Sequence, residues 1–253
     1  MVLRYFILTW IFLFTACATN TKKDHTIAKI PEASGICYDK NSKTLYTISD
    51  RGTVYQLSLS GKKLRKNHIG NFDIEGIACD SKNDRLLVIS EGNDNILIIN
   101  KKNLTIKKKI DIKRSFKGVK ILLKDKEYGI EGITIDDDGY IFISNQSHHK
   151  YPHPDPSVII KIKDLHKSKT KILSVIDPRR KDIAGLDYHK GYLYMVSDTN
   201  DKLYRYDFKE KRIDAKAKLP KFAQEGVAFD EDGNIYFADD NGRILKYSAD
   251  EIL

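Results

Sequence analysis

The chain has 253 residues and a formal net charge of +9, from 44 lysines and arginines against 35 acidic residues. Its basic residues are scattered and form no stripe interleaved with aromatic residues, which argues against nucleic acid as a partner. A scattered positive surface suits solubility or attraction to anionic glycans and lipid headgroups. Beyond the N-terminal segment about 230 residues remain, enough for one domain.

The N-terminal segment predicts an exported lipoprotein. After a short basic start, residues 5–14 are apolar, and small residues then lead to Cys17. An apolar run of about ten residues is too short to span a bilayer and suits a signal peptide. The position of Cys17 resembles a bacterial lipobox, which implies removal of residues 1–16, acylation of Cys17 with chains such as palmitate, and a tether over residues 17–25. Ala18 favours the outer membrane, and an ordinary secretory signal with a chance cysteine is the alternative.

Five similar repeats follow, each marked by a glycine after a glutamate or a small residue. The glycines are 41, 56, 53 and 41 residues apart, and they are Gly35, Gly76, Gly132, Gly185 and Gly226. A period of roughly 40–50 residues built from short strands is typical of a β-propeller. A propeller brings the same loop of every blade to one channel mouth, so residues far apart in the sequence become neighbours.

Each repeat continues into further strands that are separated by turn residues. We expect second strands at 44–49, 85–90, 140–144, 192–197 and 234–238. Third strands are expected at 53–58, 95–100, 157–162, 202–207 and 243–247, and outer strands at 105–112, 170–176 and 213–219. The sequence therefore predicts an all-β fold with blades of four strands.

The last repeat ends before an outer strand can form. Residues 26–31 resemble the segment before Gly226, so we expect them to complete the last blade and close the ring, which removes an unpaired edge. The prediction is one five-bladed propeller over residues 26–253, with the extra residues in an insert at 113–130 and a loop at 146–156.

Acidic residues concentrate at equivalent positions of the repeats. The residue before each glycine and the residue after each second strand reach the same mouth of a propeller channel. The first set is Ser34, Glu75, Glu131, Ala184 and Glu225; two residues earlier stand Glu32, Asp73, Gly129, Asp182 and Ala223; the second set is Asp50, Glu91, Asn145, Asp198 and Asp239. Clustered carboxylates repel one another unless a cation or proton lies among them, and calcium prefers oxygen ligands. Turn capping is the alternative for the aspartates, but it does not account for the glutamates.

The loop after Asn145 is longer than its equivalents and contains His148, His149 and His153. Three histidines could bind a transition metal, orient a phosphate or act as acid and base. The alternative is a surface loop stiffened by proline. No motif along the chain identifies a nucleophile.

Two cysteines lie on the first strands of neighbouring repeats. Cys37 and Cys79 follow their glycines by two and three residues, so they point to opposite faces of their strands. We therefore expect two buried thiols and no disulfide.

The Glu-Gly-Ile and Glu-Gly-Val repeats, the variant at 182–185 and the closing motif at 224–236 resemble the SdiA-regulated domain family. The resemblance covers residues 26–249 and implies an exported or envelope propeller whose family activity is not established. More distant similarity to gluconolactonase-like and phytase-esterase-like propellers implies calcium in the channel. By that similarity the metal ligands are Glu75, Glu131, Glu225, Asn145 and Asp198.

The sequence thus predicts an envelope-anchored lipoprotein that binds calcium and a small-molecule, glycan or protein ligand at its acidic mouth. The expected ligand contacts are Asp50, Glu91, Asp239, Asp73, Asp182, His148, His149 and His153. The alternative is a calcium-dependent hydrolase of lactones, esters or phosphoesters, in which a histidine assists. A histidine loop folded over the acidic residues would favour the hydrolase, and one that points away would favour the binding module.

Overall fold

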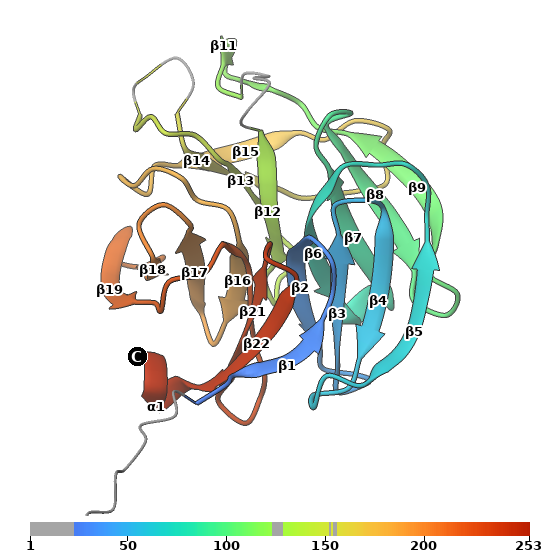
Figure 1. Cartoon of the computed structure of the whole chain (residues 1–253). Helices are drawn as coiled ribbons and strands as arrows, with labels where there is room; N and C mark the ends of the chain where they lie inside the picture. Colours follow the sequence, from blue (N-terminus) through green and yellow to red (C-terminus); the bar gives the residue numbers. More distant parts are fainter. Residues whose placement is uncertain (1–22, 123–128, 152, 154–155) are drawn as a thin grey trace, which may run out of the picture.

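Five four-stranded antiparallel sheets surround a central channel in the computed structural model, which describes residues 23–122, 129–151, 153 and 156–253 (Figure 1). Blade 1 contains β2 (Ala33–Asp39), β3 (Thr44–Ser49), β4 (Thr53–Leu57) and β5 (Lys63–His68). Blade 2 contains β6 (Ile74–Asp80), β7 (Arg85–Ser90), β8 (Asn95–Asn100) and β9 (Thr105–Asp111). Blade 3 contains β12 (Ile130–Ile135), β13 (Ile141–Asn145), β14 (Val158–Ile162) and β15 (Ile172–Ile176).

The other two blades complete the ring. Blade 4 contains β16 (Leu186–His189), β17 (Tyr192–Ser197), β18 (Lys202–Asp207) and β19 (Arg212–Lys218). Blade 5 contains β20 (Gln224–Phe229), β21 (Asn234–Asp239), β22 (Arg243–Ser248) and the N-terminal β1 (Thr26–Lys29). A small hairpin of β10 (Ser115–Phe116) and β11 (Val119–Lys120) lies in the predicted insert, and a short helix, α1 (Ala249–Ile252), follows the last strand.

The N-terminal strand closes the ring as predicted. In the antiparallel pairing of β1 with β22, Lys29 lies opposite Arg243, and the Ile30 amide donates to the Gly242 carbonyl at 3.0 Å (Figure 1). The five-bladed propeller is therefore confirmed. Blade 1 also has an outer strand, β5, that the sequence did not reveal, because its residues are mostly charged and exposed and carry no apolar pattern.

The repeat glycines are explained by how closely the inner strands approach one another around the channel. A Cβ on Gly76 would overlap the carbonyl oxygen of Glu131 in the next blade, and one on Gly132 would overlap that of Ala184. A Cβ on Gly185 would lie 2.6 Å from the carbonyl oxygen of Glu225. Any larger residue would therefore push neighbouring blades apart, which is why the repeat keeps glycine at this position.

The hydrophobic core lies between the blades. Within the described residues it divides into five clusters, and each cluster combines side chains of two neighbouring blades. One of them joins Ile36 and Leu45 of blade 1 to Tyr236 and Ile244 of blade 5 across the closure. Each blade therefore buries both faces, which fits the long apolar runs of its central strands.

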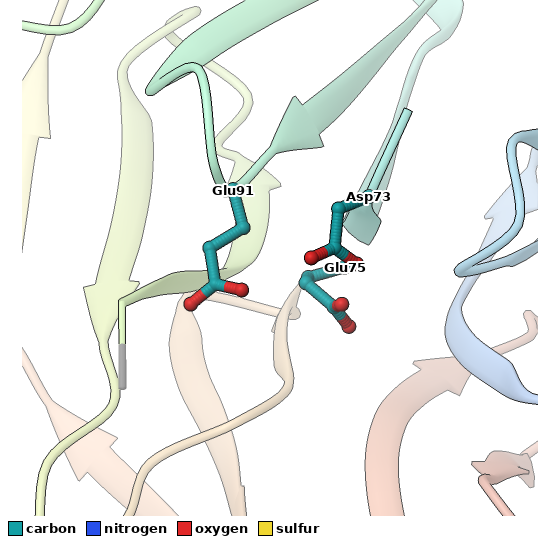
Figure 2. Close-up of side chains that lie close together, drawn as sticks. All are labelled: Asp73, Glu75 and Glu91. Atoms are coloured by element: carbon teal, nitrogen blue, oxygen red, sulfur yellow. The ribbon is translucent and has the colours of Figure 1, made fainter. Parts of the chain in front are cut away.

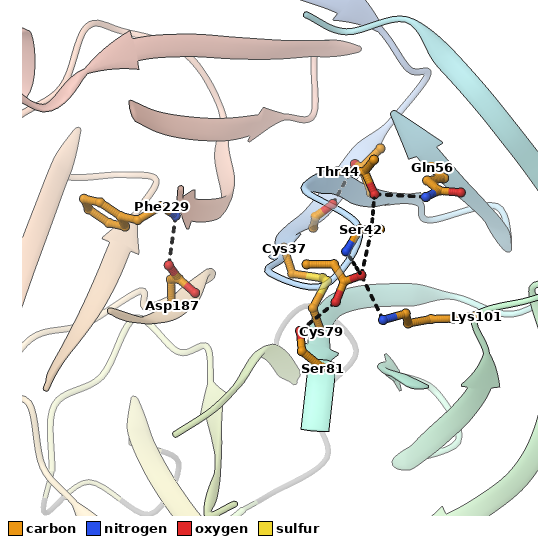
Figure 3. The surroundings of a disulfide bond; sticks show 12 residues. Cys37, Ser42, Thr44, Gln56, Cys79, Ser81, Lys101, Asp187 and Phe229 are labelled. Carbon is orange, nitrogen blue, oxygen red and sulfur yellow. Dashed lines mark hydrogen bonds and ion pairs between the residues drawn. A yellow bond between two sulfur atoms is a disulfide. The ribbon is translucent and has the colours of Figure 1, made fainter. Parts of the chain in front are cut away.

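A disulfide joins Cys37 and Cys79 across the first two blades, with the Cα atoms 5.7 Å apart (Figure 3). The prediction of two free thiols is wrong, because it compared the faces of single strands and ignored how blades stack. Neighbouring blades pack face to face, so side chains on opposite faces of adjacent inner strands point toward each other. Cysteine side chains on opposite faces of adjacent inner strands are therefore placed to form this disulfide.

The predicted signal peptide, Cys17 and most of the predicted tether lie outside the described residues. In the part of the chain that is described, no helix has the length and apolar character needed to cross a membrane.

Candidate cation site at the acidic mouth of the channel

The inner strands position the repeat glutamates through a shared irregularity. In β6, β12 and β20 the strand register shifts at the Glu-Gly step, between Ile74 and Ile77 in the first of these strands. A bulge of this kind re-aims a side chain, and it is a frequent feature near functional sites. The glycine in each repeat thus permits close packing of the blades, and the bulge beside it sets the direction of the glutamate.

The residues before the glycines and those after the second strands meet at one mouth of the channel. The Glu91 amide donates to the Asp73 carbonyl at 2.9 Å, and in blade 1 the Asp50 amide donates to the Glu32 carbonyl at 3.1 Å. The two acidic sets therefore face the same end, as the sequence predicts.

Three carboxylates from blade 2 form the tightest group. One oxygen from each of Asp73, Glu75 and Glu91 lies within 4.8 Å of the other two (Figure 2). Asp73 is exposed, whereas Glu75 and Glu91 are half-buried. Of the five metal ligands predicted by similarity, this group includes only Glu75, and its other members come from the predicted ligand contacts.

Glu91 extends from blade 2 toward blade 3. Its side chain packs against Gly129, where a Cβ would overlap the Glu91 carboxylate. Gly129 occupies the blade 3 position that is equivalent to Asp73, so the absence of a side chain there makes room for Glu91. The sequence contains this exchange of an acidic residue for glycine, but its meaning depends on the packing of two blades.

The glutamates of three blades influence one another's ionisation. Burial, followed by the charges of Glu91 and Glu225, raises the pKa of Glu131 well above its ordinary value. Burial and the neighbouring Glu131 raise the pKa of Glu75 in the same way. Burial, with the charge of Asp198, raises the pKa of Glu225 to about 8. Without a compensating cation, Glu225 therefore largely holds its proton at neutral pH, and the same causes favour the protonated forms of Glu75 and Glu131.

Asn145 and Asp198 lie beside this set. Asn145 is 1% exposed and donates its amide to the Pro156 carbonyl at 3.0 Å, while its Oδ1 has no hydrogen-bond partner within the described residues. It pairs in the sheet with Ile130, next to Glu131. Asp198 accepts a hydrogen bond from the Gln224 amide at 3.0 Å, and so caps the backbone before Glu225.

Other predicted contacts have local structural partners. Asp182 accepts from the amide and the hydroxyl of Thr199, both at 2.7 Å. Asp239 is fully buried, caps the turn through the Asn241 amide and pairs with Arg243 at 2.6 Å. Asp182 and Asp239 therefore fit the turn-capping alternative better than a role in the cation site.

Asp50 belongs to a separate rim group in blade 1. Burial and the neighbouring Glu32 raise the pKa of Asp50 to about 6. Glu32 itself pairs with Arg51, so this part of the mouth carries its own positive charge.

The histidine loop starts beside the acidic mouth. The Asp182 amide donates to the Ser147 carbonyl at 2.7 Å. His148, His149 and His153 are exposed, and the rings of His149 and His153 stack with their centroids 3.7 Å apart. The described part of the loop therefore presents its histidines to solvent.

Comparison with known proteins identifies the family of the chain. The model of the family described as SdiA-regulated matches residues 16–242, and the chain belongs to that family. No curated protein sequence matches the chain.

Solved structures show the same fold at low sequence identity. A glutaminyl cyclase from Myxococcus xanthus has a TM-score of 0.65 and 12% identity, over 88% of this chain and 93% of that one. A Bacteroides caccae protein of unknown function has a TM-score of 0.56 and 8% identity, over 86% and 78%. A streptogramin B lyase has a TM-score of 0.50 and 15% identity, over 89% and 72%. At these identities the likeness concerns the fold.

Proposed function

We propose that the acidic mouth binds calcium and that the protein is a lipid-anchored envelope module that presents this site to a small-molecule, glycan or protein ligand. The observation that carries the proposal is the grouping of Asp73, Glu75 and Glu91 beside the buried Glu131. Among the described residues, no lysine or arginine forms an ion pair with Glu75 or Glu131. A hard cation is then the natural compensation for their charge, since it accepts several carboxylate and amide oxygens.

The donor set suits calcium better than a transition metal. The clustered groups are carboxylates, and the buried Oδ1 of Asn145 is a further oxygen donor near Glu131. Calcium takes six to eight oxygen ligands in flexible geometry, with waters filling the remaining positions. Imidazole and thiolate ligands, which favour transition metals, are not part of the group.

Melting temperature with calcium and with chelator tests this site. Calcium stabilises only the folded chain, so at about 100 times its dissociation constant it adds roughly 2.7 kcal/mol to the free energy of unfolding. Glu75→Gln and Glu131→Gln should reduce that gain. Asp214→Asn is the matched control. Asp214 lies on the outer strand of blade 4, where it pairs with Arg205 of the neighbouring strand β18. Equal melting temperatures with calcium and chelator in the wild-type protein would contradict the proposal.

Export is supported by the Cys37–Cys79 disulfide, since such bonds persist in oxidising compartments outside the cytosol. The lipid anchor rests on the sequence around Cys17. Wild-type protein expressed in bacteria should partition into a detergent phase, and Cys17→Ser should move it to the aqueous phase without changing its fold. Aqueous partitioning of the wild type would contradict the anchor.

A calcium-dependent hydrolase of lactones, esters or phosphoesters is the second candidate. It is favoured by Glu225, whose pKa of about 8 would let it exchange protons near neutral pH. The solved structures with this fold also include a cyclase and a lyase. The sequence offers no motif that identifies a nucleophile, so the binding module is preferred. A panel of lactone, ester and phosphoester substrates with wild type and Glu225→Gln separates the two: turnover that the variant loses would favour the hydrolase.

A further inference from the structure

The opposite end of the channel contains a cavity. It has a volume of about 220 Å³ and is formed where the inner strands of all five blades end. Its wall includes the Cys37–Cys79 disulfide, the aromatic side chains of Tyr38, Tyr188 and Phe229, and the carboxylate of Asp187. A concave, partly apolar site with one convergent charged group has the features of a small-molecule pocket, though this one is small.

Asp187 occupies a position that links neighbouring blades elsewhere in the ring. Two residues after its repeat glycine, blade 3 has Thr134, whose hydroxyl accepts from the Tyr188 amide of the next blade at 2.9 Å. Asp187 accepts in the same way from the Phe229 amide at 2.9 Å. In blade 1 the equivalent residue is Cys37, and there the link is the disulfide. A neutral hydroxyl is enough for this link, so the carboxylate of Asp187 brings a charge that the link does not need.

The two oxygens of the Asp187 carboxylate have different surroundings. One oxygen accepts from Phe229, and the other points away from that ring toward the disulfide side of the channel (Figure 3). Within the described residues Asp187 forms no ion pair, and burial raises its pKa to about 8. Lys40 lies at the rim, where it is paired with Asp137 at 3.6 Å. Burial also lowers the pKa of the adjacent His189 to about 4, so that imidazole is neutral at physiological pH.

The net charge of the cavity depends on Asp187. At the ends of the first three inner strands, Lys40 and Lys82 balance Asp136 and Asp137, because Asp80 is already paired with Arg85 at 2.7 Å. The end of β16 adds only the neutral His189. With Asp187 ionised, the balance inside the cavity is negative, and the aromatic rings offer faces to the apolar part of a cationic ligand.

We propose that this cavity binds a small primary ammonium ligand, with Asp187 as its ionic partner and Tyr38, Tyr188 and Phe229 around its alkyl part. Binding then requires an ionised Asp187, so the ammonium group displaces the proton that the free carboxyl holds at neutral pH. The site is separate from the acidic mouth and does not depend on calcium.

The Phe229 amide, which donates to Asp187, is a reporter for this site in nuclear magnetic resonance titrations. n-Butylammonium should shift its resonance in a saturable way, whereas 1-butanol, a neutral molecule of similar size, should not. The apparent affinity should rise between pH 6 and pH 8, by up to about tenfold per unit, because Asp187 loses its proton over that range. In the wild-type protein, either a pH-independent affinity or equal shifts with 1-butanol would overturn the proposal.

Two variants separate the charge of Asp187 from its structural role. Asp187→Asn keeps an acceptor for the Phe229 amide but removes the charge, and it should weaken n-butylammonium binding at least tenfold. Glu131→Gln should leave the affinity unchanged, because that residue belongs to the other mouth. Unchanged binding in Asp187→Asn would show that the carboxylate serves only to link the blades.

Discussion

Removing the disulfide between Cys37 and Cys79 tests how the first two blades are held together. The bond joins residues 42 positions apart in the sequence. For a cross-link of this span the chain-entropy relation gives a loss of about 4 kcal/mol in the free energy of unfolding when the bond is removed. For a domain of about 230 residues, such a loss lowers the melting temperature by roughly 8–16 °C.

The experiment compares wild type with Cys37→Ala/Cys79→Ala in equilibrium urea unfolding. Circular dichroism is the suitable probe, because the single tryptophan, Trp10, precedes the propeller. Cys17→Ser is the control, since Cys17 also precedes the first strand and its loss leaves the closed loop intact. Peptide mapping under non-reducing conditions checks the bond directly. A double variant within about 1 kcal/mol of wild type, or a map with both cysteines as free thiols, would refute the reasoning.

Three further predictions follow from the packing and the charges of the channel. Gly132→Ala should lower the free energy of unfolding in urea by about 3 kcal/mol, because its methyl group would overlap the Ala184 carbonyl. A loss below about 0.5 kcal/mol would mean that the blades can separate freely. Metal-free protein should lose stability as pH rises from about 5 to about 8, because over this range the folded state holds a proton on Glu225 that the unfolded state has released. In melting temperatures measured across this pH range, Glu225→Gln should reduce the dependence on pH. An unchanged dependence would contradict the raised pKa of Glu225. Gly129→Ala should retain the fold but displace the Glu91 carboxylate. Calcium binding measured by calorimetry should then weaken about tenfold, which is roughly 1.4 kcal/mol in the free energy of binding. Wild-type affinity in this variant would exclude Glu91 as a ligand.

Much of the architecture could be predicted because the repeat is local and periodic. Gly35 and its four equivalents mark the inner strands, and the missing outer strand after Tyr247 requires a partner from the N-terminus. Residues 26–29 provide that partner, as the matching sequence before Gly226 indicates. The outer strand β5 escaped prediction because both of its faces are largely exposed, so burial imposes no apolar alternation on it.

The site was harder to predict because it depends on contacts between blades. Equivalent positions indicate that Glu75, Glu91 and Glu131 reach one mouth, but not which carboxylates lie within ligand distance. That choice depends on Gly129, which leaves room for Glu91 to extend toward blade 3. Asp187 gave one signal that went unused, since it is the only charged residue at a position that elsewhere has Cys37, Ala78, Thr134 and Ala228.

Calorimetric titration of the purified protein with calcium at pH 7, in two buffers of different ionisation enthalpy, tests the central claim most directly. Calcium should bind with the release of at least one proton, because burial and the neighbouring carboxylates raise the pKa of Glu75, Glu131 and Glu225, and a carboxyl group must ionise to act as a ligand. Glu131→Gln should weaken binding and release fewer protons. Absence of binding heat in both buffers, or binding without proton release, would contradict the account.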